Sequence, residues 1–238
     1  MTAEEVLAEL EKLGTAQNRK IYARHGVTDP CFGVSYGNLE KLVKRLRKEP
    51  DPERNEALWS SGNHDARALA LKLVRPEDLS ARLVDRWARE ITAPVLAGDF
   101  GVMLGRSGWD GVEKTAERWL RANPKTRPQV AAAGWCLVSA LATEDHDWSD
   151  DRWSDLLARI EAEIQSAPNR IRHVMNNALI AIGSRSPALR KQAEAVARRI
   201  GKVEVDHGET SCQTPDAIAY LEKVWTHQAK KKRARRRC

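Results

Sequence analysis

The segment from Arg127 to Ala142, RPQVAAAGWCLVSALA, most constrains the fold of this chain. From Gln129 onward only Gln129 and Ser139 are polar, so a helix formed here is apolar on every side and has to be buried by other elements. Small residues crowd its first half, from Ala131 to Gly134, which lets a neighbouring backbone or a bulky side chain approach closely. The chain therefore needs several further helices packed around this one.

Two other stretches, Asp65 to Val74 and His173 to Gly183, have a similar apolar character, and each follows a longer, charged amphipathic pattern. Helical periodicity runs through the chain, whereas the alternation typical of strands is nearly absent. Charged helix, tight turn and apolar helix recur at a spacing of about 35 to 45 residues, which is typical of HEAT-like repeats. The sequence predicts an all-α fold, a curved α-solenoid of HEAT-like helical repeats (an α-α superhelix) whose second helices line a concave face.

Cysteine usage and hydropathy indicate the compartment. The four cysteines include no close pair, and one lies in the central apolar helix, which is typical of a reducing environment. The N-terminal segment is acidic and amphipathic, and no window reaches the roughly 18 apolar residues that a membrane span requires. We therefore expect a soluble, cytoplasmic protein without membrane contact, and a monomer.

The formal charge of +7 is carried by the end of the chain. The last nine residues, KKKRARRRC, hold seven Lys and Arg residues and no acid, so the rest of the chain is neutral overall. A basic run this dense is usually disordered. We expect one helical-repeat domain over residues 1–225, with a polar loop at 201–214, and a disordered basic tail over 226–238. The tail either adds phosphate contacts or only improves solubility.

Phosphate-binding loops, dinucleotide fingerprints, HExxH and nucleophile elbows are all absent from the sequence. The candidates are instead polar residues in apolar surroundings, of which Asp99 in PVLAGDFGVML is the sharpest. A carboxylate there is costly unless it is paired or used. Asp99 is therefore either a helix cap or an ion-pair partner of Arg67 or Arg106, or it is a carboxylate that faces the concave groove.

The amides of Asn176 and Asn177 lie in another apolar helix pattern. They either satisfy neighbouring backbone groups or point into the groove to contact a base or a phosphate. Among the eight tryptophans, Trp109 and Trp148 lie beside loops, which makes them candidates for exposed stacking on bases.

Two basic segments near the N-terminus complete the candidate surface. Tyr22, with Arg24 close by, can stack on or hydrogen-bond a ligand, although an aromatic residue on a helix often belongs to the core. The helix expected from about Ser35 to Lys48 turns a basic face outward, which includes Lys44 and Arg47.

The loop VEVDHGETSC places Asp206, His207, Glu209 and Cys212 within seven residues. These side chains include metal-ligand types, but their spacing matches no common metal motif. A loop held by Asx and Ser/Thr hydrogen bonds explains the same residues. We expect neither a metal ion nor a cofactor.

At LWSSGNHDARALALKLV, DRWAREI and VMNNALIAIGSRSPAL the sequence resembles the AlkD-like DNA alkylation repair proteins, a superfamily of HEAT-like repeat DNA glycosylases. The resemblance runs from about Tyr22 to Ile200. It implies a solenoid that holds duplex DNA by its backbone in a basic concave cleft. It also implies excision of positively charged N3- and N7-alkylated purines without flipping the base into a pocket.

The resemblance assigns roles to particular residues. The family's Trp-Asp-x-x-Asp segment falls on residues 95–99, so that Asp99 keeps the acid that stabilises the charge developing as the glycosidic bond breaks, and Val95 replaces the Trp. Asn177 stands where the family has its second cleft Trp, and Tyr22 matches its N-terminal cleft Tyr. Ala131 and the alanine after it replace the family's Arg-rich entry to the central helix.

These observations predict a DNA alkylation repair-type protein that binds duplex DNA, in particular alkylated DNA, in its concave groove. Asp99 is the predicted electrostatic catalyst of an alkylpurine DNA glycosylase, a hydrolase of N-glycosyl bonds, which would associate with the nucleoid when bound to DNA. The alternative is a non-enzymatic HEAT-like module that binds DNA or a protein partner. The predicted DNA-binding residues are Tyr22, Arg24, Lys44, Arg47, Asn176 and Asn177.

Overall fold

The computed structural model describes residues 1–144 and 146–235, of which 232–235 as backbone only. These residues form thirteen α-helices, a short 3-10 helix at Pro76–Asp78 and no strand. The all-α prediction is therefore confirmed. The helices are α1 (Ala3–Leu13), α2 (Ala16–Arg24), α3 (Tyr36–Leu46), α4 (Pro52–Ser60), α5 (His64–Leu73), α6 (Ala81–Glu90), α7 (Pro94–Ser107), α8 (Val112–Leu120), α9 (Pro128–Thr143), α10 (Asp150–Glu163), α11 (Asn169–Gly183), α12 (Pro187–Ile200) and α13 (Ala217–Arg235).

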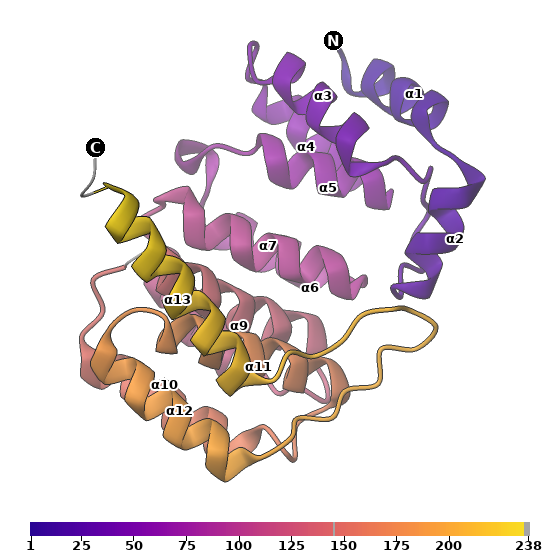
Figure 1. Cartoon of the computed structure of the whole chain (residues 1–238). Coiled ribbons are helices and arrows are strands. Elements are labelled where there is room, and N and C mark those ends of the chain that lie inside the picture. Colours follow the sequence, from indigo (N-terminus) through magenta and orange to yellow (C-terminus); the bar gives the residue numbers. More distant parts are fainter. Residues whose placement is uncertain (145, 236–238) are drawn as a thin grey trace.

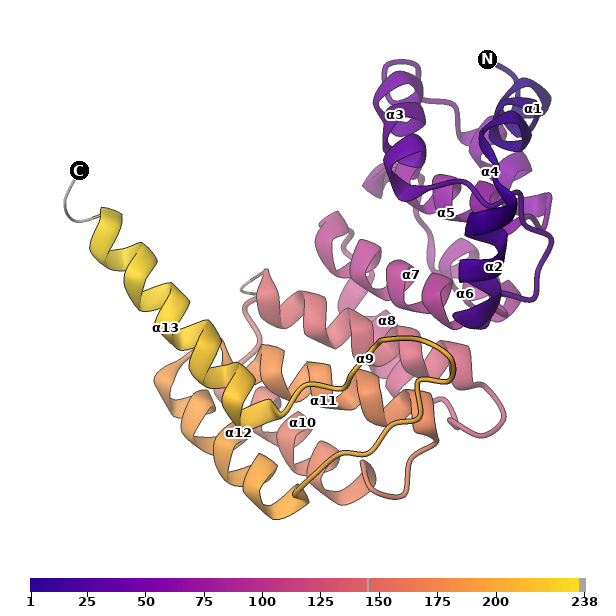
Figure 2. The same ribbon diagram turned by 45° about the vertical axis from the view of Figure 1, so that its right-hand side comes forward.

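The helices stack in pairs as expected of HEAT-like repeats. The second helices α5, α7, α9 and α11 pack side by side in an inner layer, and the first helices of the pairs cover them on the outside (Figure 1). The layers curve, so that α3 and α13 stand at the two sides of one concave face (Figure 2). The solenoid architecture predicted from the repeat spacing is confirmed.

The central helix α9 is buried along almost its whole length, between α7, α8 and α11. Glycines let its neighbours approach it. A Cβ built on Gly101 of α7 would lie 2.3 Å from the carbonyl oxygen of Ala133, and one on Gly134 would lie 3.1 Å from the backbone of Trp119 in α8. The small residues in the first half of the helix therefore allow close packing, as the sequence predicted.

Aromatic side chains bind the outer layer to the inner one. Trp59 of α4 and Trp87 of α6 stack with ring centroids 4.2 Å apart, and Phe100 of α7 lies against both. Trp119 of α8 continues the chain of contacts at 5.3 Å from Phe100. Such pairs add about 0.5 to 1.5 kcal/mol each beyond their buried area, so they fix the stacking of successive pairs.

The C-terminal part of the chain departs from the expectation. We expected the last helix to end near Trp225 and a disordered tail to follow, but α13 continues to Arg235. Ala, Gln, Lys and Arg are all good helix formers, and α13 is anchored to the end of α11, where Trp225 donates a 3.0 Å hydrogen bond to the carbonyl of Gly183. Residues 236–238 of the predicted tail lie outside the described residues.

Two further expectations are corrected. Helix α10 begins at Asp150, earlier than expected, because Ser149 caps it and the acidic residues after it favour a helix start. Trp148 is not an exposed stacking residue, since it is buried against His146 and Trp153 and is covered by the guanidinium of Arg152 at 3.7 Å.

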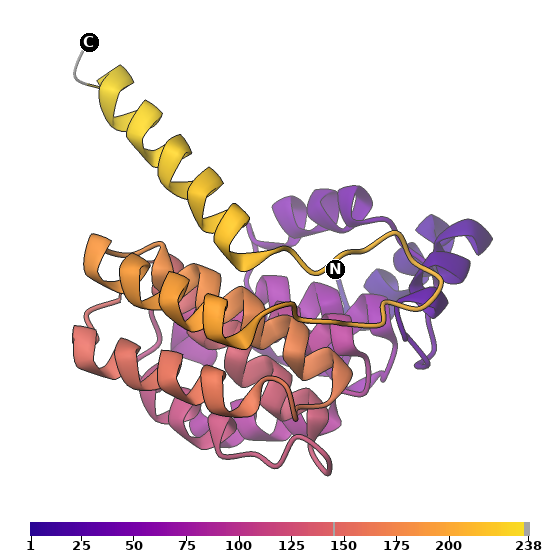
Figure 3. The ribbon, with the colours of Figure 1, turned by 60° about the horizontal axis from the view of Figure 1, so that its bottom comes forward.

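Residues 201–216 form a long connection that we call the C-terminal strap. It leaves α12, runs along the start of α11, reaches toward α2 and returns to α13 (Figure 3). Asn169 of α11 holds it, since its amide oxygen accepts the backbone N–H of Asp206 at 2.8 Å and its amide nitrogen donates to the carbonyl of the same residue. The strap therefore borders one end of the concave face.

Candidate functional site

Asp99 lies just before the middle of α7 and is turned toward α3. Tyr36, the first residue of α3, donates its hydroxyl to the Asp99 carboxylate at 3.1 Å. Burial raises the pKa of Asp99, while the hydrogen bond from Tyr36 and the positive charge of Lys72 oppose that rise. The carboxylate is partly buried and receives one neutral donor from α3.

The two ion pairs that the sequence suggested for Asp99 do not form. Arg67 lies 3.6 Å from Asp29 and donates to the carbonyl of Glu90, and Arg106 pairs with Glu144 at 2.9 Å. Nor does Asp99 cap a helix, because it lies within α7. The alternative that places a carboxylate on the inner face of the solenoid therefore fits the geometry.

Helix α3 turns one side toward Asp99 and the end of α5. Tyr36, Glu40 and Lys44 follow one another at intervals of four residues, which places them on one face of the helix. Glu40 accepts a 2.7 Å hydrogen bond from Lys72 of α5, and the Lys72 ammonium lies 5.8 Å from the Tyr36 ring. The predicted contact residue Lys44 is exposed on this face.

Tyr22 lies beside this group but is used by the fold. Its hydroxyl donates to the carbonyl of Val34, and its ring meets His64 edge-on at 5.3 Å. Burial, with the negative charges of Asp65 and Asp99 nearby, raises the pKa of Tyr22 to about 12. Tyr22 is therefore a neutral phenol that supports the segment leading into Tyr36.

Asp65, like Tyr36, is a residue that the sequence analysis missed. It is fully buried, and its carboxylate accepts the backbone N–H groups of Phe32, Gly33 and Val34 at 2.7, 3.0 and 2.9 Å. These bonds fix the segment that carries Tyr36 to Asp99. The signal in the sequence was an acid next to a His at the start of an apolar helix, which also resembles an ordinary acidic first turn.

The inner face continues from α7 to α11 through Cys136 of α9. Burial raises the pKa of the Cys136 thiol to about 12, and the thiol lies within electrostatic range of both Arg170 and Asp99. Three neighbouring inner helices therefore contribute one carboxylate, one neutral thiol and one partly exposed guanidinium.

Asn177 belongs to a small polar cluster where α11 meets the strap. Its amide nitrogen lies 3.2 Å from His173 Nε2, and His173 Nδ1 lies 3.0 Å from the hydroxyl of Thr214. His207 approaches the same hydroxyl at 3.0 Å. Burial, followed by the charges of His207 and Arg170, lowers the pKa of His173 to about 4. This cluster fastens the strap to the inner face.

Three of the residues predicted to contact DNA do not lie together with Tyr36 and Asp99. Asn176 cannot contact DNA, because it is 2% exposed and donates to the carbonyl of Pro215 at 3.0 Å. Arg47 is exposed but caps α5 by donating to the carbonyl of Lys72 at 2.8 Å. Arg24 is exposed at the end of α2, two residues from Tyr22 and hence on another side of that helix.

The acidic, histidine and thiol side chains of the strap do not converge. In the described part of the chain, the ligand atoms of Glu113, His146 and Asp147 form the one group within 4.8 Å of one another, and Glu113 is already paired with Arg152. Within the strap, Asp206 accepts the N–H of Gly208 at 2.8 Å, as in an Asx turn. Local hydrogen bonds, the alternative to a metal site, thus account for this segment.

No described helix has the length and hydropathy to cross a membrane.

The fold and this face define a helical-repeat protein with a polar concave surface. Residues 6–221 match the family model described as DNA alkylation repair enzyme. The chain belongs to this family, so the resemblance inferred from short motifs is confirmed.

Individual relatives agree over nearly the full length. The chain is 28% identical to the uncharacterized protein Lin0241 of Listeria innocua and 27% identical to the uncharacterized protein Lmo0209 of Listeria monocytogenes, in each case over 94% of this chain and 97% of the relative. A solved structure shares 27% identity and a TM-score of 0.83, covering 96% of this chain and 95% of its own. That structure represents "a new family of proteins related to the HEAT-like repeat DNA glycosylases with affinity for branched DNA structures".

Proposed function

We propose that this protein binds DNA across its concave face and prefers branched DNA to an uninterrupted duplex. The family membership supports a DNA substrate. The structural relative with affinity for branched DNA has the same fold, and its match to 96% of this chain includes the helices of the concave face. The helical layers curve between α3 and α13 (Figure 2), and duplex arms that diverge from one point can follow a surface that curves in this way.

The observation that carries the proposal is the distribution of charge around the concave face. The inner helices present mainly small or uncharged groups there, such as Cys136, Ser139 and Asn177. Exposed lysines border them, with Lys44 on α3 and Lys230 on α13. Cations at two borders, and a floor that carries Asp99 and Arg170 among mainly uncharged groups, suit two rows of phosphates better than an acidic protein partner.

The test is a comparison of DNA structures at several salt concentrations. Fluorescence anisotropy would measure the affinity of the full chain for a three-way junction and for a duplex of equal length. We expect tighter binding to the junction and weaker binding with Lys44→Ala, but not with Lys114→Ala, a matched change on the outer helix α8. Equal affinities would overturn the preference for branched DNA, and no binding to either would overturn the DNA-binding function.

A glycosylase activity is the second candidate, and the geometry of Asp99 favours it. A carboxylate on the inner face, held by a neutral hydroxyl and not by an arginine, can stabilise positive charge that develops on a sugar. Val95 and Asn177 provide no aromatic clamp, so the substrate would be held differently from the family pattern. Methylated duplex and junction DNA should release methylpurines with the wild type and not with Asp99→Asn; release by both would exclude Asp99 as the catalyst.

A further inference from the structure

A groove of about 550 Å³ lies between α9, α11 and α13, on the same inner face as Cys136 and Asn177. This volume is in the range of ligand-binding pockets. Helix α11 forms its floor, while α9 and α13 form its walls. The groove is not part of the Asp99 site described above, and no residue of that site lines it.

Tyr220 provides the one large exposed aromatic ring of this groove. Tyr220 is 46% exposed, whereas the next residue, Leu221, is fully buried and anchors α13. Tyr220 and Gln228 are eight residues apart on the same face of α13, and Gln228 donates to the carbonyl of Ser184 at the far end of the groove. The orientation of α13 is thus fixed, and the ring is presented on a rigid element.

The α9 wall and the α11 floor of the groove present hydrogen-bond acceptors. Ser139, Thr143 and Ser184 each donate their hydroxyl proton to a carbonyl of their own helix, at 2.9, 2.7 and 2.7 Å. Their oxygen lone pairs therefore remain free to accept. Asn177 uses its amide nitrogen toward His173, which leaves its carbonyl oxygen as a further acceptor. A ligand that combines a flat aromatic face with N–H donors on its edge would match this lining.

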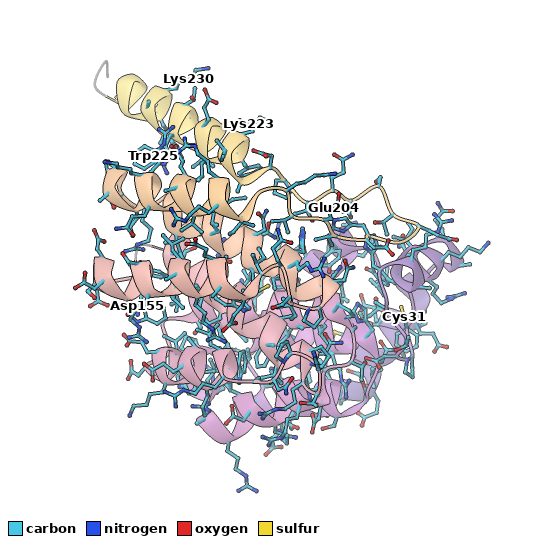
Figure 4. The ribbon with its side chains drawn as sticks, turned by 90° about the horizontal axis from the view of Figure 1, so that it is seen from below. Cys31, Asp155, Glu204, Lys223, Trp225 and Lys230 are labelled. Carbon is cyan, nitrogen blue, oxygen red and sulfur yellow. The ribbon has the colours of Figure 1, made fainter. Side chains whose placement is uncertain are left out.

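The surroundings of the groove favour a ligand attached to phosphates. Beyond Tyr220, α13 exposes Lys223, Lys230 and Lys231, with Glu222 as its one acidic residue. Trp225 lies on the side of α13 that faces α12, with Lys230 on the far side (Figure 4). Lys230 is therefore free of the packing that holds α13 in place. Together with the exposed Lys231, it can approach a DNA backbone that passes along α13.

We propose that the groove between α9, α11 and α13 binds one unstacked nucleobase at the branch point of DNA, with Tyr220 as the stacking surface and Asn177 among the acceptors. This inference rests on the proposed function and assigns a site to its preference for branches. Branch points expose bases that lack a stacking neighbour, which an uninterrupted duplex does not. Adenine, cytosine and guanine, which carry exocyclic amino groups, fit the acceptor lining better than thymine.

The test uses the full chain and a three-way junction that carries adenine, thymine or an abasic site at one unpaired branch position. Stacking of a base on an aromatic side chain contributes to binding affinity, so the wild-type protein should bind the adenine junction at least about fivefold more tightly than the abasic junction. The affinity for the thymine junction should lie between these two. Tyr220→Ala should abolish this ratio, and Tyr220→Phe, which keeps the ring, should retain it. Because the ratio is measured within each variant, a small loss of stability in Tyr220→Ala does not affect it.

Each result decides between the two proposals. If the wild type binds all three junctions with equal affinity, or if Tyr220→Ala keeps the adenine preference, the base site is wrong and DNA binding stands. If no junction is bound at all, the proposed function and the base site both fail.

Discussion

Tyr36 and Asp99 meet between the first turn of α3 and the inner helix α7, where the tyrosine hydroxyl donates a 3.1 Å hydrogen bond to the carboxylate. The two residues are far apart in the sequence, and Asp65 brings them together by fixing the segment before Tyr36. A hydrogen bond from such a donor favours the charged form of a partly buried carboxylate. Tyr36 therefore opposes the rise in the Asp99 pKa that burial causes.

Replacing Tyr36 by Phe should raise the pKa of Asp99 further above its usual range, because burial already raises it and the hydrogen bond that the variant lacks had lowered it. An NMR titration of the Asp99 carboxyl carbon would measure the change. If Asp99 is the glycosylase catalyst, the lower limb of the pH–rate profile should move to higher pH by the same amount. Tyr220→Phe is the matched control, and an equal shift in that variant would contradict the assignment.

Asp65→Asn should destabilise the protein by roughly 2 to 4 kcal/mol, because a buried amide cannot accept three N–H groups and places its own NH₂ against one or two of them. Urea denaturation monitored by circular dichroism would measure the free energy of unfolding. Asp78→Asn, which weakens a surface pair with Arg75, should cost less than about 1 kcal/mol. Similar losses of unfolding free energy in both variants would show that the Asp65 carboxylate does not stabilise the segment from Phe32 to Val34.

The sequence predicts most helices well because their signals are local. Caps such as Thr2 and Ser80 and apolar stripes mark where helices begin and which side is buried. The site is less predictable because its contacts join distant segments. Nothing near Asp99 in the sequence indicates Tyr36 as its partner, and Asn176 and Asn177 are equivalent in the pattern until the fold buries one of them. The end of α13 differs from the expectation because a dense run of like charges is typical of disorder, whereas the Ala, Gln, Lys and Arg residues of this run favour a helix.

Gly101→Ala should weaken the packing of α7 on α9. The new Cβ would lie 2.3 Å from the carbonyl oxygen of Ala133, which is backbone and can move only with its helix, so a loss of about 1 to 3 kcal/mol is expected. Gly37→Ala is the control, since a Cβ there meets nothing within 4 Å on helix α3 and should stabilise by about 0.5 to 1 kcal/mol. Thermal and urea denaturation would compare the two, and equal effects would refute the close approach.

Acid should destabilise the protein partly through His173. Its pKa in the folded state is lowered to about 4, so the unfolded chain binds the proton more readily. The contribution to stability is fully present above about pH 6.5 and is lost as the pH falls toward 4. His173→Gln should make the fall in unfolding free energy between pH 6.5 and 4.5 shallower, by at most about 1.4 kcal/mol per pH unit. Buried His64 accounts for part of the remaining slope, since burial lowers its pKa as well.

His227→Gln provides the control for this measurement, because His227 is exposed on α13. It should leave the pH dependence of stability unchanged. A slope in His173→Gln equal to that of the wild type would show that the polar cluster with Thr214 and His207 does not disfavour the charged imidazole.

The lysines of α13 should contribute to DNA binding through the phosphates and not through the sequence of the bases. Replacing Lys230 and Lys231 together by Ala removes two exposed cations and keeps α13 helical, since Ala is the best helix former. The slope of log affinity against log salt should become shallower by about 0.9 for each phosphate that the variant no longer neutralises. Lys114→Ala combined with Lys125→Ala removes two exposed cations from α8 and from the connection between α8 and α9 instead, and it should leave the slope as it is. An equal change in both double variants would mean that overall charge, and not the position of α13 beside the concave face, controls the interaction.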